Sequence, residues 1–212
     1  MIFGIALLVV FLLFALYGKA KRKANAQYQE NFRGFEGGLS DNAEDVKQYK
    51  EVAEQGNADA QWKLGMSYFR GKGVKTDKVE GVKWLTKAAK QEYAKAQCSL
   101  GIIDLEGEGV GEGAEEGVEW LRKAAVQGYA HAQNQLGICY FGGNGVSEDS
   151  SEGFKWFEKA AQQGHVDACY NLGLCYKEGN GVGRDVTEAA HWLKIASEKG
   201  HLKARVELSW LR

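Results

Sequence analysis

The sequence predicts an all-α fold in which a pair of helices is repeated along the chain to build a solenoid. Three marks recur with a period of 36 residues and without insertion or deletion. Such self-similarity is typical of stacked supersecondary units, and four units exceed the roughly three that a stable stack needs. The marks are a Leu-Gly pair, a Gly-Val pair and a tryptophan, at Leu64-Gly65, Leu100-Gly101, Leu136-Gly137 and Leu172-Gly173; Gly73-Val74, Gly109-Val110, Gly145-Val146 and Gly181-Val182; and Trp84, Trp120, Trp156 and Trp192.

The first helix of each unit, here called helix A, is predicted from a four-residue spacing. Ala60, Leu64 and Tyr68 line one helix face. The same pattern recurs in each of the next three units, except that Asp104 replaces tyrosine in the second. Gly65 lies beside that face, where the lack of a side chain lets a second helix approach closely. Gly71 is expected to end the helix in the left-handed conformation that glycine adopts without strain.

The second helix, helix B, is predicted to begin at an aspartate followed three residues later by a glutamate. This pair stands at Asp77, Asp149 and Asp185, whose side chains are suited to accept the unpaired amides of the first turn, whereas Gly113 takes the place in the second unit. The tryptophans and alanines of helix B are expected to face the core. Glycine ends the helix in the later units, and Glu92 replaces it in the first at a cost of about 1 kcal/mol if the left-handed conformation is kept.

Residues 1–18 are predicted to form a single transmembrane anchor. The apolar run from Ile2 to Tyr17 would span about 24 Å as a helix, slightly less than a hydrocarbon layer of ~30 Å. Basic residues follow this run, whereas a cleaved secretory signal carries its charge before it. By the positive-inside rule the repeats lie in the cytoplasm at the cell inner membrane; export to the periplasm is the alternative. The basic residues are Lys19, Lys21, Arg22 and Lys23.

The remaining chain divides into a polar spacer and the repeat array. Residues 19–40 form the spacer and residues 41–212 the array. Within the array we predict a half unit at 41–57, four full units at 58–93, 94–129, 130–165 and 166–201, and a capping helix at 202–212. The capping helix matches helix A through Ala204 and Leu208, and Trp210 and Leu211 are expected to seal the end of the stack.

Composition and motif spacing argue against several kinds of chemistry. With 27 basic and 28 acidic residues the net charge is −1, so no basic field indicates nucleic acid. The four histidines show no metal-ligand spacing and are interpreted as turn residues, and Gly71-Lys72-Gly73 joins two helices rather than forming a phosphate loop after a strand. The four cysteines lack close pairs and are expected to be reduced and packed as small apolar groups. We therefore predict no cofactor, no metal, no small-molecule substrate and no catalysis.

The unit Ala…Leu-Gly-x-x-Tyr-x-x-Gly-x-Gly-Val…Asp…Trp-x-x-x-Ala-Ala-x-x-Gly resembles the Sel-1-like repeat, a relative of the tetratricopeptide repeat. The resemblance extends from Asp41 to Arg212 and is fullest from Ala132 to Gly164. It implies a right-handed superhelix of antiparallel helix pairs with a concave face, used to assemble protein complexes. Some bacterial members carry one disulfide per repeat, and the cysteines here do not match that spacing.

Partner binding is expected where the units differ, on the helix-A face opposite Ala60, Leu64 and Tyr68. In related superhelices helix A lines the concave surface, so these positions would face a bound protein. For Trp62 and Tyr170 the alternative is that they complete contacts between repeats. The resulting hypothesis is a membrane-anchored adaptor; an exported binding protein such as an immunity-type inhibitor comes second, and an enzyme third. The candidate residues are Asp59, Trp62, Lys63, Arg70, Lys95, Glu106, His131, Gln135, Asp167, Tyr170, Asn171 and Glu178.

Overall fold

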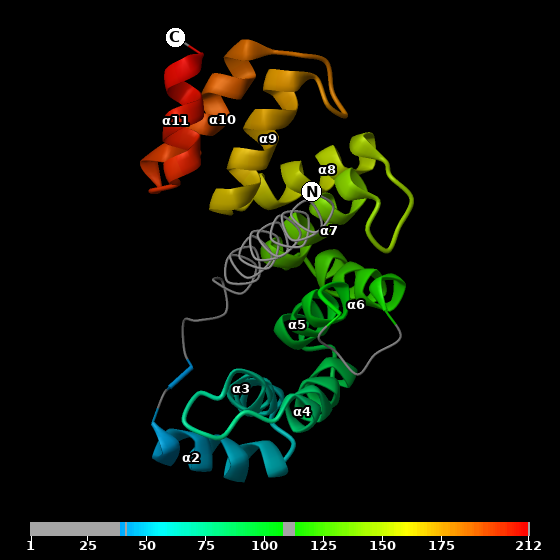
Figure 1. Ribbon diagram of the computed structural model, residues 1–212, viewed down its shortest axis with the longest axis vertical. Coiled ribbons are helices and arrows are strands. Elements are labelled where there is room, and N and C mark those ends of the chain that lie inside the picture. Colours follow the sequence, from blue (N-terminus) through cyan, green and yellow to red (C-terminus); the bar gives the residue numbers. More distant parts are fainter. Residues whose placement is uncertain (1–38, 41, 108–112, 212) are drawn as a thin grey trace, which may run out of the picture. The chain divides into compact units, whose positions relative to one another are not determined.

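The computed structural model (Figure 1) describes residues 39–40, 42–107 and 113–211, all of which belong to the compact unit Gly38–Arg212. These residues form ten α-helices and no strand, which confirms the all-α prediction for this part of the chain. The helices are α2 (Ala43–Glu54), α3 (Ala58–Arg70), α4 (Lys78–Lys90), α5 (Ala94–Leu105), α6 (Ala114–Val126), α7 (Ala130–Gly142), α8 (Ser150–Gln162), α9 (Val166–Glu178), α10 (Val186–Glu198) and α11 (Leu202–Trp210).

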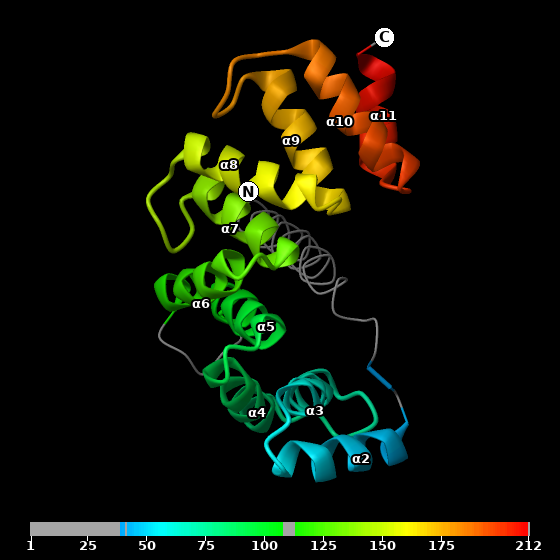
Figure 2. The same cartoon turned by 180° about the vertical axis from the view of Figure 1, so that it is seen from behind.

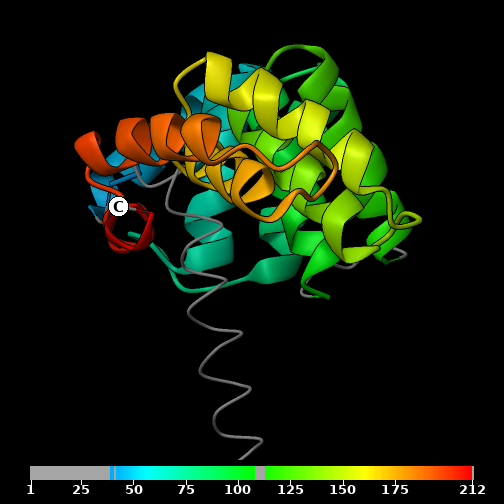
Figure 3. The ribbon, with the colours of Figure 1, turned by 90° about the horizontal axis from the view of Figure 1, so that it is seen from above.

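The helices alternate between two roles along the stack. The A helices are α3, α5, α7, α9 and α11, and the B helices are α2, α4, α6, α8 and α10. Each of α3, α5, α7 and α9 packs most extensively on the B helix that follows it and also contacts the B helix that precedes it. Successive pairs lie next to one another in chain order (Figures 1 and 2), and Figure 3 looks along the stack with α10 and α11 nearest the viewer. The predicted solenoid of helix pairs is therefore confirmed in these residues.

Glycine pairs set the distance between the two helices of a unit. A Cβ atom added to Gly65 would lie 2.9 Å from the carbonyl oxygen of Gly81, and one added to Gly81 would lie 2.8 Å from that of Gly65. The same crossing recurs at Gly101 with Gly117. The close approach predicted for helix A is confirmed, and its counterpart on helix B is a second glycine.

The core follows the repeat. Leu64, Leu100, Leu136 and Leu172 are buried in successive A helices, and each such side chain contributes about 1.5–3 kcal/mol when removed from water. Of the four repeated tryptophans, Trp84 and Trp156 are buried and the other two are half-buried. The Lys87 ammonium lies 3.6 Å from the centroid of the Trp84 ring and covers its outer face. The predicted packing role is therefore confirmed for Trp84 and Trp156, and Trp192 packs against the core of the fourth unit.

The helix ends follow the predicted capping residues. Asp77 Oδ1 accepts a hydrogen bond of 2.9 Å from the Glu80 amide, and Asp149 and Asp185 cap α8 and α10 in the same way. Gly113 provides no side-chain cap for α6. Gly71 ends α3 with φ of 72°, and Glu92 adopts φ of 60°, the left-handed conformation expected of it.

The C-terminal helix α11 packs on the fourth unit, but not all of its residues face inward as predicted. Ala204 is buried, and Leu208 and Leu211 pack against the core cluster of that unit. The expectation for Trp210 was wrong, because its side chain is 77% exposed. Trp210 follows Leu208 by two residues, a rotation of about 200° around the helix, which turns Trp210 to the side opposite this inward-facing leucine.

No helix in the described part of the chain is long and apolar enough to span a membrane. The anchor predicted at residues 2–17 lies outside the described residues.

Candidate functional site

The twelve candidate residues all lie on the A helices or immediately after α5, but their side chains differ widely in exposure. Trp62, His131 and Gln135 are buried, and Lys95 and Glu178 are exposed. The half-buried side chains are Asp59, Lys63, Arg70, Glu106, Asp167, Tyr170 and Asn171. The A-helix face is therefore a mixture of residues that join neighbouring units and residues that remain open to solvent. Their role in partner binding stays a prediction.

Trp62 joins the first unit to the second. Its ring is 1% exposed, and its Nε1–H donates a hydrogen bond of 3.0 Å to the Ser99 hydroxyl on α5. The Tyr93 ring lies 6.4 Å away between centroids, and the Lys95 ammonium lies 5.2 Å from the Trp62 centroid. In the described structure Trp62 thus makes the contact between repeats that was considered as its alternative role.

Asp59 is held in a polar cluster at the same junction. Its carboxylate accepts a hydrogen bond of 2.6 Å from the Tyr93 hydroxyl and pairs with the Lys63 ammonium at 2.8 Å. Burial raises the pKa of the Asp59 carboxyl, but the hydrogen bonds from Lys63 and Tyr93 outweigh it and leave the pKa below its usual value. The carboxylate is therefore ionised at neutral pH and fixes the start of α3 to the turn before α5.

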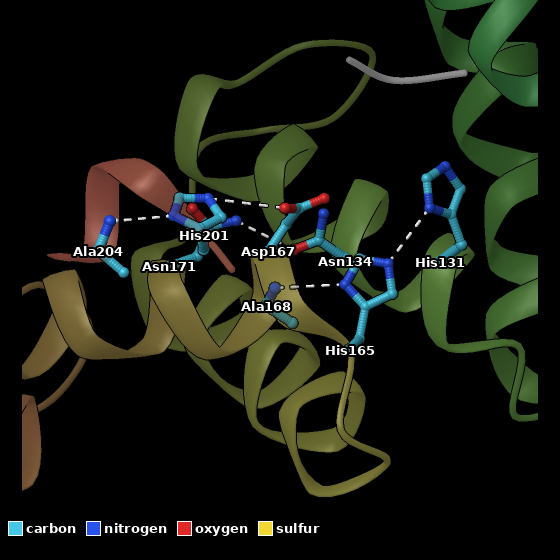
Figure 4. A network of polar contacts seen from close by, with 8 residues as sticks. All are labelled: His131, Asn134, His165, Asp167, Ala168, Asn171, His201 and Ala204. Carbon is cyan, nitrogen blue, oxygen red and sulfur yellow. Dashed lines mark hydrogen bonds and ion pairs between the residues drawn. The ribbon is translucent and has the colours of Figure 1, made fainter. Parts of the chain in front are cut away.

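A histidine pair takes the equivalent place between the third and fourth units (Figure 4). His131 Nδ1 lies 3.2 Å from His165 Nε2, and His165 Nδ1 accepts the Ala168 amide at 3.3 Å, which caps α9. Because Nδ1 of His165 is an acceptor, its proton resides on Nε2 and is donated to His131. Burial lowers the pKa of His165, although Asp167 opposes the shift, so the ring is neutral at pH 7.

His201 repeats this arrangement at the last turn of the array. Its Nδ1 accepts the Ala204 amide at 3.0 Å, and its Nε2 faces Asp167 Oδ1 at 3.6 Å (Figure 4). The Tyr170 ring stacks on the imidazole with 4.3 Å between centroids. Histidine at this position therefore caps an A helix and bonds to the preceding one, which refines the prediction that these are turn residues.

These histidines are not arranged as a metal site. No group of three or more His, Cys, Asp or Glu side chains in the described residues is placed to hold an ion. In the His131–His165 pair the nitrogen that would have to ligate an ion carries the proton, since the other nitrogen of His165 accepts a backbone amide. The pair is thus committed to hydrogen bonding within the protein.

The cysteines are free and buried. Burial raises the pKa of the thiols, to about 12 for Cys139 and Cys175. A thiol with so high a pKa carries almost no thiolate at neutral pH and is a poor nucleophile. They pack as small apolar groups, as predicted from the sequence.

A ladder of glutamines links the units and was not anticipated. Gln61 Nε2 donates to the Ala53 carbonyl at 3.0 Å, and Gln91 Nε2 donates to Gln61 Oε1 at 2.7 Å. The same two bonds recur at Gln97 with Gln127 and at Gln133 with Gln163. The sequence did contain a sign of this ladder, because glutamine recurs every 36 residues at Gln61, Gln97 and Gln133. In the fourth unit the ladder changes, because Cys169 and Lys199 occupy these positions.

An open cleft lies between α7 and α9. Its volume is about 370 Å³, and its walls include Ile138 and Phe141 from α7, Phe157 from α8 and Leu174 from α9. Of the candidate residues, Asn171 and Glu178 line it. The apolar walls were not predicted, because the binding residues expected from the sequence are mostly variable polar positions on the A helices. A signal was present in Gly142, which stands where other units carry Arg70, Glu106 and Glu178.

The fold and this A-helix face define the protein as an α-solenoid, a class that binds partners along extended surfaces made by stacked repeats. The family model described as Sel1 repeat matches residues 58–93, 94–129, 130–165 and 166–201, which is more than half of the chain. The chain therefore belongs to the Sel1 repeat family. None of the curated proteins matches the chain.

Solved structures with the same fold include two that are more than 30% identical in sequence. A protective antigen of uropathogenic Escherichia coli that displays an SLR fold is 38% identical with a TM-score of 0.75, and the match covers 78% of this chain and 36% of that one. A Sel1 repeat protein from Oxalobacter formigenes is 36% identical with a TM-score of 0.72, over 77% of this chain and 65% of that one. This chain thus spans less than two thirds of both proteins.

An immunity protein from Pseudomonas aeruginosa is 23% identical to the chain with a TM-score of 0.57, over 86% of this chain and 68% of that one. At this level of identity the likeness extends to the fold alone.

Proposed function

We propose that this chain is a membrane-anchored scaffold that binds a protein partner along the face formed by its A helices. The observation that carries the proposal is a contrast between two sets of positions on the A helices. Glycines and buried leucines recur from unit to unit, whereas neighbouring A-helix positions differ. At one such position the chain has Arg70, Glu106, Gly142 and Glu178 in turn. Repeated residues hold the stack together, so residues that change are available for recognition. The proposal includes the right-handed superhelix with a concave A-helix surface that the family resemblance implies.

The anchoring part of the proposal is based on sequence. Residues 2–17 form an uninterrupted apolar or small run that is followed by four basic residues. A single-pass anchor of this kind in the cell inner membrane, with the repeats in the cytoplasm, follows from the positive-inside rule.

In-cell photo-crosslinking tests the binding face. A photoreactive amino acid at Lys95 or at Glu178, both exposed on or beside A helices, is expected to capture one and the same protein, identified by mass spectrometry. The matched controls are Lys83 and Lys155, which are exposed on B helices. Capture of that protein from the B-helix positions with equal yield would assign binding to the other face, and no capture from either A-helix position would contradict the scaffold function.

Topology is tested separately with a reporter enzyme fused after Arg212. A reporter that works only outside the cytosol is expected to be inactive, and a variant with residues 2–17 deleted is expected to leave the membrane fraction. Reporter activity would instead favour the exported binding protein. Retention of the deleted variant in the membrane fraction would remove the anchor from the proposal.

A further inference from the structure

Gly142 leaves open space at the cleft between α7 and α9. Gly142 is the last residue of α7, and a Cβ atom added to it would meet nothing within 4 Å. Its backbone is helical, since the left-handed turn that ends the helix is made by Gly143 with φ of 63°. Neither packing nor backbone geometry requires glycine here, although glycine inside a helix is less favourable than alanine. What glycine does provide is an unobstructed entrance to the cleft that it lines.

The walls of the cleft are apolar. Ile138 is 39% exposed, unlike its equivalents Met66 and Ile102, which are buried. Phe141 and Phe157 pack against each other with 5.2 Å between ring centroids and form one wall. At about 370 Å³ the cleft falls in the range of pockets that hold small ligands, roughly 300–1,000 Å³. It can take one large apolar side chain together with part of its backbone.

The rim of the cleft is polar and carries a carboxylate. Glu178 is exposed at the end of α9, and its Oε2 accepts a hydrogen bond of 3.0 Å from Asn180 Nδ2. This bond holds the carboxylate beside the cleft, which both residues line together with Asn171. In the third and fourth units acidic residues also outnumber basic ones. A group bound here therefore benefits from a positive charge next to its apolar part.

We propose that this cleft is the recognition pocket for a protein segment that inserts a large apolar side chain and places a neighbouring lysine or arginine against Glu178. The inference rests on the proposed scaffold function and names the chemistry of the partner. An apolar anchor buried in a pocket and surrounded by polar contacts is the usual source of affinity at protein interfaces. Glu178 then selects the partner by charge, and Gly142 admits the anchor.

Methyl NMR of the full chain in detergent micelles tests the pocket directly. The probes are short capped peptides with the central residues Leu-Arg, Leu-Glu or Ala-Arg. The Leu-Arg peptide is expected to shift the Ile138 methyl signal saturably and to leave that of buried Ile102 unchanged. The Leu-Glu peptide should bind about twofold to fivefold more weakly, as expected for one exposed ion pair. The Ala-Arg peptide should give no saturable shift.

Variants at the entrance and the rim provide the matched controls. Gly142→Leu adds a large side chain at the entrance, where an added Cβ atom meets nothing within 4 Å, so it should abolish the shift at Ile138 while the chain stays folded, and Gly142→Ala should retain binding. Glu178→Lys should reverse the preference between the Leu-Arg and Leu-Glu peptides. Absence of a saturable shift with Leu-Arg at concentrations up to about 10 mM, or an unchanged shift in Gly142→Leu, would overturn the proposal.

The outcomes separate this inference from the scaffold function. If the photoreactive group at Lys95 still captures the same partner in the Gly142→Leu variant with undiminished yield, the scaffold function stands and the pocket is not its anchor site. If neither Lys95 nor Glu178 captures a protein in the otherwise unmodified chain while the Leu-Arg peptide binds at Ile138, the pocket stands and the scaffold function fails.

Discussion

The junction between α3 and α5 and the junction between α7 and α9 use the same backbone repeat with opposite results. At the first, Trp62 is buried and bonds to Ser99 of the next A helix. At the second, the equivalent residues are Asn134 and Asn171, whose side chains hydrogen-bond at 3.0 Å, and an open cleft lies nearby. The buried leucines and the glycines that follow them on the A helices are common to both. Side chains at the variable positions therefore decide whether neighbouring A helices close on each other or leave room for a ligand.

The largest expected effect is at the closed junction. Trp62→Ala removes a fully buried aromatic side chain and its hydrogen bond, and should lower the free energy of unfolding by about 3–5 kcal/mol. The matched variant Asn134→Ala removes one hydrogen bond from the open junction and should cost about 1 kcal/mol. Urea denaturation followed by circular dichroism measures both values. Equal losses would show that the two junctions are equally important for stability.

The glutamine ladder should also contribute to the stability of the first three units. Gln133→Met keeps the size of the side chain but leaves the Ala125 carbonyl and the Gln163 amide without this partner, so the expected cost is about 1–3 kcal/mol. Gln162→Met, at an exposed site on α8, is the control and should change stability little. A thermal denaturation series would detect the difference, and similar values for both variants would mean that the ladder contributes nothing.

Asp104 should make the second unit sensitive to pH. This carboxyl stands in a tyrosine position, and burial together with Glu116 raises its pKa to about 6. Because the pKa of Asp104 is higher in the folded state, the folded state binds the proton more tightly than the unfolded state does. The resulting contribution to the free energy of unfolding is fully present below the ordinary pKa of 3.8 and is lost as pH rises through about 6. Asp104→Asn should therefore raise the free energy of unfolding at pH 7 by about 1–2 kcal/mol.

The control for Asp104 is Glu119→Gln on exposed α6 surface, where little change is expected. The gain from Asp104→Asn should disappear in measurements below pH 4. A gain that is the same at every pH would show that the substitution acts through packing and not through the charge.

His165 should give a smaller effect of opposite sign, confined to the third and fourth units. Burial lowers its pKa, so the stabilisation is complete above the ordinary value of 6.5 and is lost as pH falls through the lowered pKa of the folded state. Protonation would also place a hydrogen on the nitrogen that caps α9. His165→Asn supplies the cap residue that Asn57 provides for α3, and should remove this acid sensitivity, worth about 1 kcal/mol or less.

Stability measured between pH 7 and pH 5 tests the His165 prediction. His191→Asn, an exposed position on α10, should leave the slope of stability against pH unchanged. If His191→Asn removed the acid sensitivity and His165→Asn did not, the histidine responsible would lie on α10 and not at the start of α9.

Much of the fold was predictable because the repeat offers the same evidence four times. The Leu-Gly and Gly-Val marks located the helices, and the aspartate–glutamate pairs located three of the B-helix starts. The error at Trp210 has a simple cause, since a large apolar residue at the end of an array was assumed to point inward. The helix turns it away from the core instead.

The candidate site was less predictable. A helical wheel places residues on a face but does not show how near the next A helix lies. Trp62 and His131 share the variable face with exposed Lys95, and yet their side chains are buried and bonded to neighbouring units. The glutamine ladder was visible as a period but had no recognisable purpose until Gln61 was seen between two helices.

The sequence by itself determined the period, the helix pairs and their ends, because these depend on local spacing, capping and the small size of glycine. Only the tertiary structure decided which variable side chains join the units and which leave a cleft beside Gly142. That outcome depends on distances between helices that are far apart in the chain. Such distances result from the packing of the whole stack and are not encoded in any single segment.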